Sequence, residues 1–355
     1  MKKSIVALAV LSSVAGTAFA QSSVTLFGVV DLAARYNKAG GQTTSSLASD
    51  GQSSSRLGVR GVEDLGSGMK AAFWLESALA ADSGTVGDSS TAVPVTSSGN
   101  KYWNRRATVS LSGDFGEIRL GRDKTSERNL IDEFDVYGTV GMGDITKIYS
   151  TLGSGSLDIN RSDNQVRYFL PNNLGGFYGS VDVAAGEGIN GQKYWGGRFG
   201  YKQGPLHVSA AGQVTYTTPN GPKWGLGSIA GSYDFGVVKP GLLFTESKYA
   251  GRKVTSWTIN ATVPVGQGVF KASYTNSDAN STANTAGFYD ANLITGQYIY
   301  NLSKRTSLYS TVSKLQNKGK GKLFIATATT PATTSLAPYP GGGAGGFDVG
   351  ITHSF

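Results

Sequence analysis

Hydrophobic and polar residues alternate one by one along most of the chain, which is the pattern of a β-strand with two different faces. In segment 256–263 the apolar positions are Trp257, Ile259, Ala261 and Val263, and the polar ones are Ser256, Thr258, Asn260 and Thr262. Beyond residue 20 no stretch approaches the ~18 consecutive apolar residues of a membrane-spanning helix. The pattern therefore predicts an all-β protein.

Turn signals divide the chain into strands. Seven short polar turns, most with Gly, Asp, Asn or Pro, lie at 64–68, 113–116, 171–176, 202–205, 234–236, 264–268 and 301–306. Eight longer polar segments lie at about 37–52, 80–101, 123–163, 187–192, 215–222, 247–252, 276–287 and 316–345. Fifteen connections join sixteen strands, and an even number with both ends on the short-turn side is typical of an antiparallel transmembrane β-barrel.

The polar faces carry charge in strand after strand. Arg56 and Arg60 oppose Leu57 and Val59, and Asp31 shares the polar face of the first strand. A soluble β-sandwich also alternates, but a charged inner face suits a wet lumen, with the apolar face toward lipid. Aromatic residues near strand ends are compatible with girdles at the membrane interfaces, namely Tyr36, Trp74, Trp103, Tyr168, Trp195, Tyr201, Tyr233 and Tyr309. The alternative is the general preference of aromatic residues for strands.

The last nine residues, FDVGITHSF, form an alternating strand that runs to a terminal aromatic residue. Its apolar positions are Phe347, Val349, Ile351 and Phe355. Chain ends normally fray, so this strand is expected to be sealed into a barrel by pairing with segment 24–36. Terminal-Phe strands resemble the assembly signal of bacterial outer-membrane proteins, which implies that role for Phe355.

The first twenty residues have the pattern of a secretory signal peptide. Lys2 and Lys3 precede an apolar run, and Ala18-Phe19-Ala20 is an Ala-x-Ala cleavage site. The alternative, a membrane anchor, needs ~20 apolar residues, and this run is shorter. We expect residues 1–20 to be removed near Ala20, which leaves a barrel of residues 21–355. The formal charge of +8 then falls to +6, because only Lys2 and Lys3 are lost.

Segment 123–163 is far longer than the ~12–15 residues of an ordinary loop. It mixes apolar residues with the acidic Asp132, Glu133 and Asp135. Exposed apolar residues are unfavourable, so the segment is expected to fold inward and to place these carboxylates at a pore constriction. The alternative is a disordered surface loop.

The lumen face supplies the opposing cations. Arg56, Arg60 and Arg106 are expected in the lumen, with Arg161 where the long loop rejoins the barrel. Lys70 and Arg119 are further candidates, and Arg105 has the parity of the opposite face and is expected at the rim. Rings of charged side chains set ion preference. The alternative for one or two of these arginines is a pairing with lumen-side wall carboxylates such as Glu63, Glu76 and Glu117.

Several segments, spread in order over the chain after the signal peptide, resemble the betaproteobacterial branch of the trimeric general porins. They include SSRLGVRGVEDLGSGMKAAFWLE from Ser54, RRATVSLSGDFGEIRLGRD from Arg105 and VRYFLPNNLGGF from Val166. The resemblance implies a homotrimer of sixteen-stranded barrels in the Gram-negative outer membrane, among lipid and lipopolysaccharide. It further implies a third external loop folded inside each barrel and a basic ladder of Arg56, Arg106 and Arg161.

Little in the sequence points to catalysis. The chain has no cysteine, and its two histidines, His207 and His353, show no metal-ligand spacing. The charged lumen and the resemblance to the general porins together make a passive diffusion channel for small hydrophilic solutes and ions the expected function, with a preference for anions, no cofactor, no nucleic-acid partner and no enzymatic activity. A substrate-specific channel and a barrel enzyme or adhesin are the alternatives.

Overall fold

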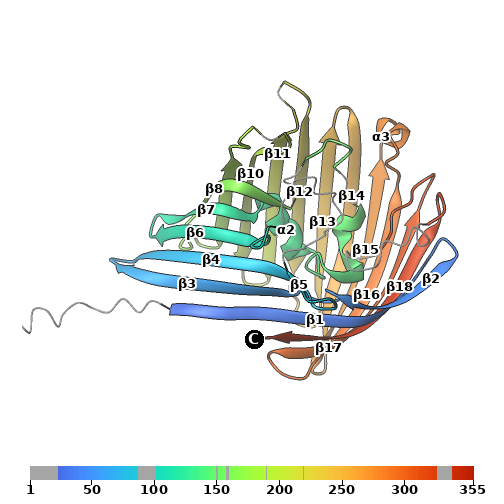
Figure 1. Ribbon diagram of the computed structural model, residues 1–355, viewed down its shortest axis with the longest axis horizontal. Coiled ribbons are helices and arrows are strands. Elements are labelled where there is room, and N and C mark those ends of the chain that lie inside the picture. The colour runs from blue at the N-terminus through green and yellow to red at the C-terminus, as the bar shows by residue number, and fades with distance from the viewer. Residues whose placement is uncertain are drawn as a thin grey trace, which may run out of the picture.

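The computed structural model describes residues 23–86, 101–148, 151–156, 160–188, 190–218, 220–325 and 338–355, so the predicted signal peptide lies outside it. Sixteen antiparallel strands within these residues form one closed barrel (Figure 1), which confirms the predicted number. They are β1 (Ser23–Ala39), β3 (Arg56–Gly66), β4 (Met69–Ala80), β6 (Arg106–Gly113), β7 (Gly116–Lys124), β8 (Arg161–Phe169), β9 (Phe177–Ala184), β10 (Lys193–Gln203), β11 (Leu206–Tyr216), β12 (Lys223–Tyr233), β13 (Lys239–Tyr249), β14 (Arg252–Val265), β15 (Gly268–Ala279), β16 (Ala291–Asn301), β17 (Thr306–Asn317) and β18 (Gly343–Ser354).

Two short strands extend the barrel wall. β2 (Gln42–Ser49) pairs with the second half of β1, and β5 (Thr85–Val86) pairs with the end of β4. The prediction of a loop at 37–52 is therefore wrong for most of that range. Gly40 and Gly41, both with positive φ, close a tight β1–β2 turn instead. The break between β2 and β3 is held by Asp31, whose carboxylate accepts backbone hydrogen bonds from residues 51–53.

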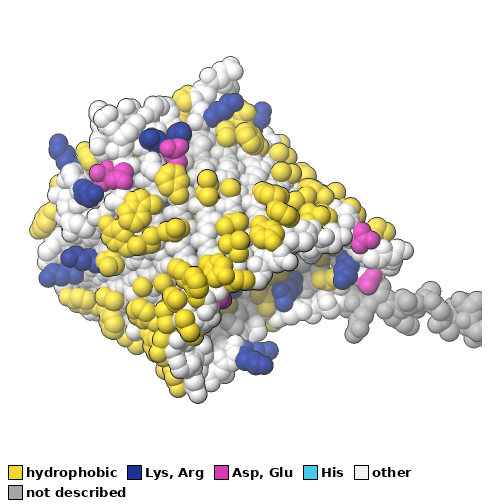
Figure 2. Space-filling model, turned by 180° about the vertical axis from the view of Figure 1, so that it is seen from behind, with side chains coloured by type: hydrophobic (Ala, Val, Ile, Leu, Met, Phe, Trp, Pro, Cys, Tyr) yellow, Lys and Arg dark blue, Asp and Glu magenta, His cyan; other side chains and the backbone are white. Residues whose placement is uncertain are grey.

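The two faces of the wall differ as the alternation predicts. In β9, Val181 and Val183 are 61% and 53% exposed, whereas Ser180 and Asp182 are buried on the inner side. Figure 2 shows hydrophobic side chains spread over the outer surface, with charged side chains mainly toward its edges. Aromatic residues on this outer face include Tyr36, Trp195 and Tyr233.

Two of the aromatic residues predicted for the membrane interfaces lie on the inner face instead. Trp74 lines the lumen, and Tyr309 is buried and donates a hydrogen bond to Asp31 at 2.6 Å. Their positions follow from strand parity, because Trp74 lies two residues from the inward-facing Glu76. That part of the interface prediction is wrong.

The C-terminal strand closes the barrel. β18 pairs with β17 on one side and with β1 on the other, from Val29 opposite Ser354 to Ala39 opposite Ala344. The part of β1 that pairs with β18 is thus residues 29–39, whereas the prediction was residues 24–36. Phe355 continues the ladder through two backbone hydrogen bonds of 3.1 Å with Gly28. Phe347, Val349, Ile351 and Phe355 are all 45–49% exposed, so all four face outward.

Residues 125–148, which follow β7, fold into the barrel. Helix α2 (Ser126–Phe134) begins at Thr125, whose hydroxyl accepts a hydrogen bond from the backbone N–H of Arg128 at 3.1 Å. Its apolar side chains pack against inward-facing residues of β12 and β13, in the cluster Leu130, Ile131, Phe134, Ile145, Trp224, Leu226, Ala230 and Leu243. Figure 1 shows α2 within the curve of the strands.

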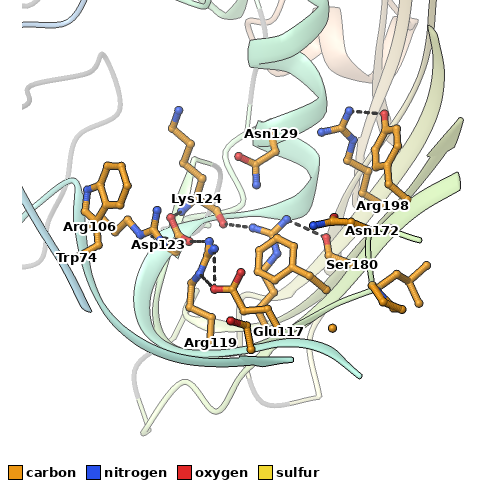
Figure 3. Close-up of a pocket in the computed structure, with 18 of the residues that line it drawn as sticks. Trp74, Arg106, Glu117, Arg119, Asp123, Lys124, Asn129, Asn172, Ser180 and Arg198 are labelled. Carbon is orange, nitrogen blue, oxygen red and sulfur yellow. Dashed lines mark hydrogen bonds and ion pairs between the residues drawn. The ribbon is translucent and has the colours of Figure 1, made fainter. Parts of the chain in front are cut away.

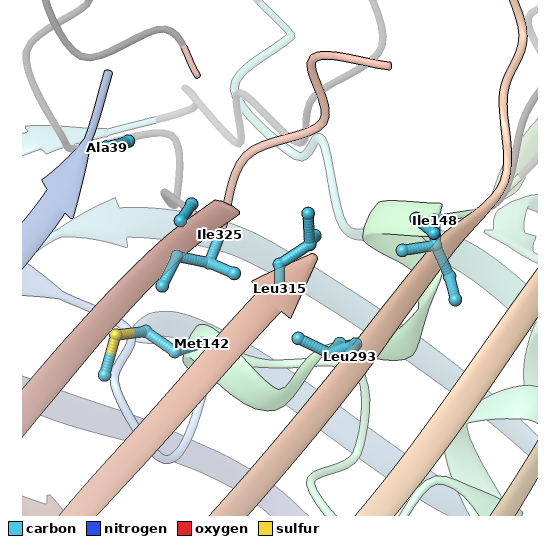
Figure 4. Packing of buried hydrophobic residues seen from close by; sticks show 8 residues of the cluster. Ala39, Met142, Ile148, Leu293, Leu315 and Ile325 are labelled. Carbon is cyan, nitrogen blue, oxygen red and sulfur yellow. The ribbon is translucent and has the colours of Figure 1, made fainter. Parts of the chain in front are cut away.

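A second apolar cluster holds the residues that follow α2. The short 3₁₀ helices η1 (Gly141–Gly143) and η2 (Ile145–Ile148) contribute Met142 and Ile148, which pack with Leu293, Leu315 and Ile325 (Figure 4). Each such buried side chain contributes about 1.5–3 kcal/mol to holding the segment in place. The remaining helix, α3 (Ser281–Thr285), lies between β15 and β16. No helix among the described residues is long and apolar enough to cross a membrane.

Candidate functional site: the barrel lumen

A cavity of about 1190 Å³ occupies the lumen between α2 and one side of the wall. At one end it reaches Gly68, Asp114 and Asn172, at the short turns, and at the other it reaches Asn129 and Glu133 of α2. Figure 3 shows charged side chains from β6, β7 and β10 pointing into it. The space is therefore a passage lined by charge, with α2 along one side.

The four arginines predicted for the basic side of the pore all line this cavity. Arg56 and Arg60 lie on β3, Arg106 begins β6, and Arg161 begins β8. The pleat explains their common direction on β3, because residues four apart share a face. Arg161 is held by a hydrogen bond of 2.9 Å from its Nε to the carbonyl of Arg105. The structure thus brings the four side chains together.

Carboxylates of the wall neutralise part of this basic surface. Glu76 accepts from Arg105 at 2.5 Å and lies 4.0 Å from Arg56. Asp123 lies 3.8 Å from Arg106 and 2.6 Å from Arg119. Some arginines therefore do pair with wall carboxylates, as the alternative interpretation predicted. These are Arg56 and Arg105, beside Glu76, and Arg119, which also pairs with Glu117 at 2.9 Å.

Other cations of the cavity keep their charge uncompensated at short range. In the described part of the chain, Arg60, Lys70 and Arg161 form no ion pair with a carboxylate within 4.0 Å. Such groups attract mobile anions more strongly than paired ones, because no fixed negative charge cancels their field.

The three acidic residues predicted for the constriction have different environments. Glu133 is exposed to the cavity and forms an ion pair with Arg198 of β10. Asp132 is paired within the loop region, with Arg128 at 2.5 Å and Lys124 at 2.6 Å. Burial alone would raise the pKa of Asp132, but these two cations lower it to about 2. Asp132 is thus kept ionised by Arg128 and Lys124.

Asp135 is buried, and its carboxylate accepts hydrogen bonds from the backbone N–H groups of Tyr137 at 3.1 Å and Thr139 at 2.9 Å. Burial, together with the nearby Asp144 carboxylate, raises the pKa of Asp135 to about 7. The prediction that Asp135 lines the pore is therefore wrong, because this side chain shapes the turn after α2.

Several cavity-lining cations were missed by the strand pattern or misplaced by it. Arg105 lines the cavity, contrary to its predicted place at the rim, because it precedes β6 and the parity of that strand does not apply to it. Arg198 also lines the cavity, and its guanidinium donates to Tyr178 Oη at 2.7 Å. The alternation along β10 could have predicted this position, because Trp195 and Phe199 face outward and Arg198 has the opposite parity. Arg167 and Lys124 complete this group.

Residues 7–320 match the family model described as Gram-negative porin. This chain belongs to the Gram-negative porins. Outer membrane porin protein 32 of Delftia acidovorans is 37% identical to this porin over 373 residues, 100% of each chain. The major outer membrane protein P.IB of Neisseria meningitidis serogroup B is 27% identical over 364 residues, 92% of this chain and 97% of its own. The resemblance to betaproteobacterial porins is thereby confirmed.

Solved structures agree with this assignment. The anion-selective porin from Comamonas acidovorans matches with a TM-score of 0.80 and 33% identity, covering 94% of this porin and 100% of that chain. OmpT of Vibrio cholerae in its trimer form matches with a TM-score of 0.65 and 16% identity, over 94% and 99%, and shows the fold alone. This porin is a passive channel of the outer membrane, and its closed barrel and charged lumen suit small hydrophilic solutes.

Proposed function

We propose that this porin prefers anions and that its cavity is the selective part of the pore. Ten basic side chains line the described cavity against five acidic ones, Glu76, Asp114, Glu117, Asp123 and Glu133. This imbalance carries the proposal, because an excess of fixed positive charge in a narrow aqueous passage with low-dielectric protein walls concentrates anions and repels cations. The similarity to the anion-selective porin from Comamonas acidovorans supports it.

The constriction is proposed to lie between α2 and the basic wall. Glu133 with Arg198 would form one side, and Arg56, Arg106 and Arg161 would form the other. Arginine suits this position because its guanidinium stays charged and is only weakly hydrated. Opposite charges across the passage would also orient dipolar solutes.

Planar bilayers test the selectivity proposal. The purified porin should give stepwise conductance. In a gradient of potassium chloride its reversal potential should lie toward the chloride equilibrium potential. A general pore should show no saturation by uncharged hydrophilic solutes, whereas saturation at low concentration would favour a substrate-specific channel. In this proposal the porin catalyses no reaction and uses neither cofactor nor metal.

The assembly is proposed to be a homotrimer. Support comes from the family and from the trimer form of the Vibrio cholerae OmpT, whose fold this chain shares. Light scattering of the detergent-solubilised porin should give three times the mass of one chain plus bound detergent. A mass of one chain would contradict the proposal.

Outer-membrane lipid and lipopolysaccharide are the proposed surroundings of the barrel. At the end of β10–β12 away from the short turns, the Nζ atoms of Lys193 and Lys223 lie 5.1 Å and 4.5 Å from the ring centre of Tyr216. These three residues follow the outward face that carries Trp195. Two cations beside an apolar belt suit the phosphate groups of lipid headgroups.

The leader is proposed to be cleaved after Ala20 on export. Mass spectrometry of the porin from outer membranes should then find Gln21 as its first residue. A mature chain that keeps residues 1–20 would contradict this cleavage site.

A further inference from the structure

Two aromatic rings face the lumen beside the basic ladder. Phe27 of β1 and Trp74 of β4 both line the cavity, and their rings meet edge to face, with centroids 5.0 Å apart and planes 65° apart. Aromatic pairs of this geometry are favourable, but the lumen of an outer-membrane barrel is generally polar. An apolar surface in the lumen is therefore unusual, and it could contact apolar parts of solutes that pass.

The sequence around this pair gives it a fixed shape. Phe27 lies opposite Gly58 of β3, and a Cβ atom at position 58 would lie 2.4 Å from Phe27 Cζ. The glycine therefore lets the Phe27 ring cross β3 and reach Trp74. Trp74 is held from its other end, since its Nε1–H donates to Glu76 at 3.1 Å. The two rings thus form a preorganised surface, which is defined here as the aromatic platform.

Arg60 lies over this platform. Its guanidinium carbon is 5.3 Å from the ring centre of Phe27 and 5.0 Å from that of Trp74. Within the described residues it has no carboxylate partner, whereas Arg106, 4.5 Å from the Trp74 ring, lies 3.8 Å from Asp123. Cation–π contacts hold a guanidinium without occupying its N–H donors. The guanidinium of Arg60 is thus held by the two rings, and its N–H groups remain able to donate hydrogen bonds to a solute.

We propose that Phe27, Trp74 and Arg60 form a subsite for aromatic carboxylates. The carboxylate accepts hydrogen bonds from the Arg60 guanidinium, and the ring of the solute packs on the aromatic platform. The inference rests on the proposed anion-preferring channel and adds a class of solute to it. Chloride and small aliphatic acids gain only the charge interaction, whereas aromatic acids gain ring contact as well.

Blockade of the chloride current tests this subsite. Benzoate and cyclohexanecarboxylate carry the same charge and have similar size, but only benzoate is planar and aromatic. In bilayers holding the full-length mature porin, benzoate should halve the chloride current at a concentration about three- to tenfold lower than cyclohexanecarboxylate. The ratio of the two concentrations within one protein cancels any change in the chloride pathway itself.

Substitutions then assign the effect to the platform. Trp74→Leu and Phe27→Leu should each bring the ratio close to one, and Arg60→Gln should weaken blockade by both acids. Phe73→Leu is the matched control, because Phe73 is the neighbour of Trp74 on the outer face of β4 and is 37% exposed. It should keep the wild-type ratio.

The outcomes separate the subsite from the channel. Equal half-blocking concentrations in the wild-type porin would overturn the subsite, as would a ratio that survives in both Trp74→Leu and Phe27→Leu. The wild-type comparison stands even if either variant fails to fold. Absence of conductance, or a cation preference in potassium chloride alone, would instead overturn the proposed function.

Discussion

Arg35 and Asp348 join the first and last strands of the barrel through a buried, two-pronged ion pair. Arg35 Nε lies 2.7 Å from Asp348 Oδ1 and Nη2 lies 2.6 Å from Oδ2, and both side chains are completely buried. The two residues are direct cross-strand partners of β1 and β18. The seam that closes the barrel is therefore fixed by a specific pair as well as by backbone hydrogen bonds.

Removing one partner of this pair should weaken barrel closure. In Asp348→Asn the Arg35 charge remains buried without its counter-ion, and such changes cost about 3–5 kcal/mol. Urea unfolding in detergent should show a lower midpoint for this variant. The double variant Arg35→Met with Asp348→Leu should recover much of the loss, because it removes both charges of the pair and leaves neither without its partner. An unchanged midpoint in Asp348→Asn would show that the pair does not stabilise the seam.

Phe355 should matter for assembly beyond its share of the apolar surface. Its backbone pairs with Gly28, and its ring occupies the space above that glycine, where a Cβ atom would lie 2.4 Å from Phe355 Cζ. Deleting Phe355 should reduce the folded porin recovered from outer membranes several-fold. Phe347→Leu, a change on the same face of β18 that keeps the terminal residue, is the control. Equal recovery of the deletion variant would end the assembly role of Phe355.

Arg106 should contribute strongly to anion preference. Arg106→Glu replaces a cavity-lining cation by an anion and changes the local charge by two units, so the reversal potential should move toward the cation side. Arg305→Glu makes the same charge change in the exposed polar turn between β16 and β17 and should have a much smaller effect. Comparable shifts in the two variants would place Arg106 outside the selective part of the pore.

Glu133 and Asp135 should differ although they lie two residues apart. Glu133→Gln removes a negative charge from the cavity and frees Arg198, so the preference for chloride should increase. Asp135→Asn should leave selectivity nearly unchanged, because Asp135 is buried in the turn after α2. Reversal potentials of the two variants distinguish these roles, and a larger shift in Asp135→Asn would contradict the assignment.

The attachment of the inner loop should weaken as the pH rises. Burial raises the pKa of Glu127 to about 8, and burial beside Asp144 raises that of Asp135 to about 7. Both acids bind protons more tightly in the attached loop than in a detached one. Their contribution is therefore complete below about pH 4 and is lost as the pH rises through about 7 to 8. Burial lowers the pKa of Lys147 to about 8, so its own pH dependence lies above this window.

A spin label can report this change. The chain has no cysteine, so Asn129→Cys gives a unique site on α2 at the edge of the cavity. The label should become more mobile between pH 5 and pH 8, and the change should be smaller when Glu127→Gln and Asp135→Asn are added. The same increase in mobility with both added substitutions would show that other groups set the pH response.

The sequence predicted the wall of the pore better than its loop. Arg56 and Arg60 could be placed because the pleat of a strand fixes which side each residue faces. The same rule would have placed Trp74 in the lumen, four residues from Lys70 and two from Glu76, had it been applied to the aromatic residues. Arg105 lies just outside a strand, so parity gave the wrong answer.

No comparable rule predicts which way the side chains of the long loop point. Asp132, Glu133 and Asp135 could not be distinguished from sequence, because their environments depend on contacts with distant strands. Glu133 meets Arg198, and Asp132 meets Lys124, while Asp135 turns back on its own loop. The apolar residues of α2 did indicate that the loop would be buried, and the apolar cluster that α2 forms with β12 and β13 accounts for them.

The reversal potential of the wild-type porin in a gradient of potassium chloride tests the central claim most directly. With ten basic and five acidic side chains on the described cavity, the potential should lie toward the chloride equilibrium value. A potential near zero or toward the potassium value would contradict the proposal that this lumen selects anions.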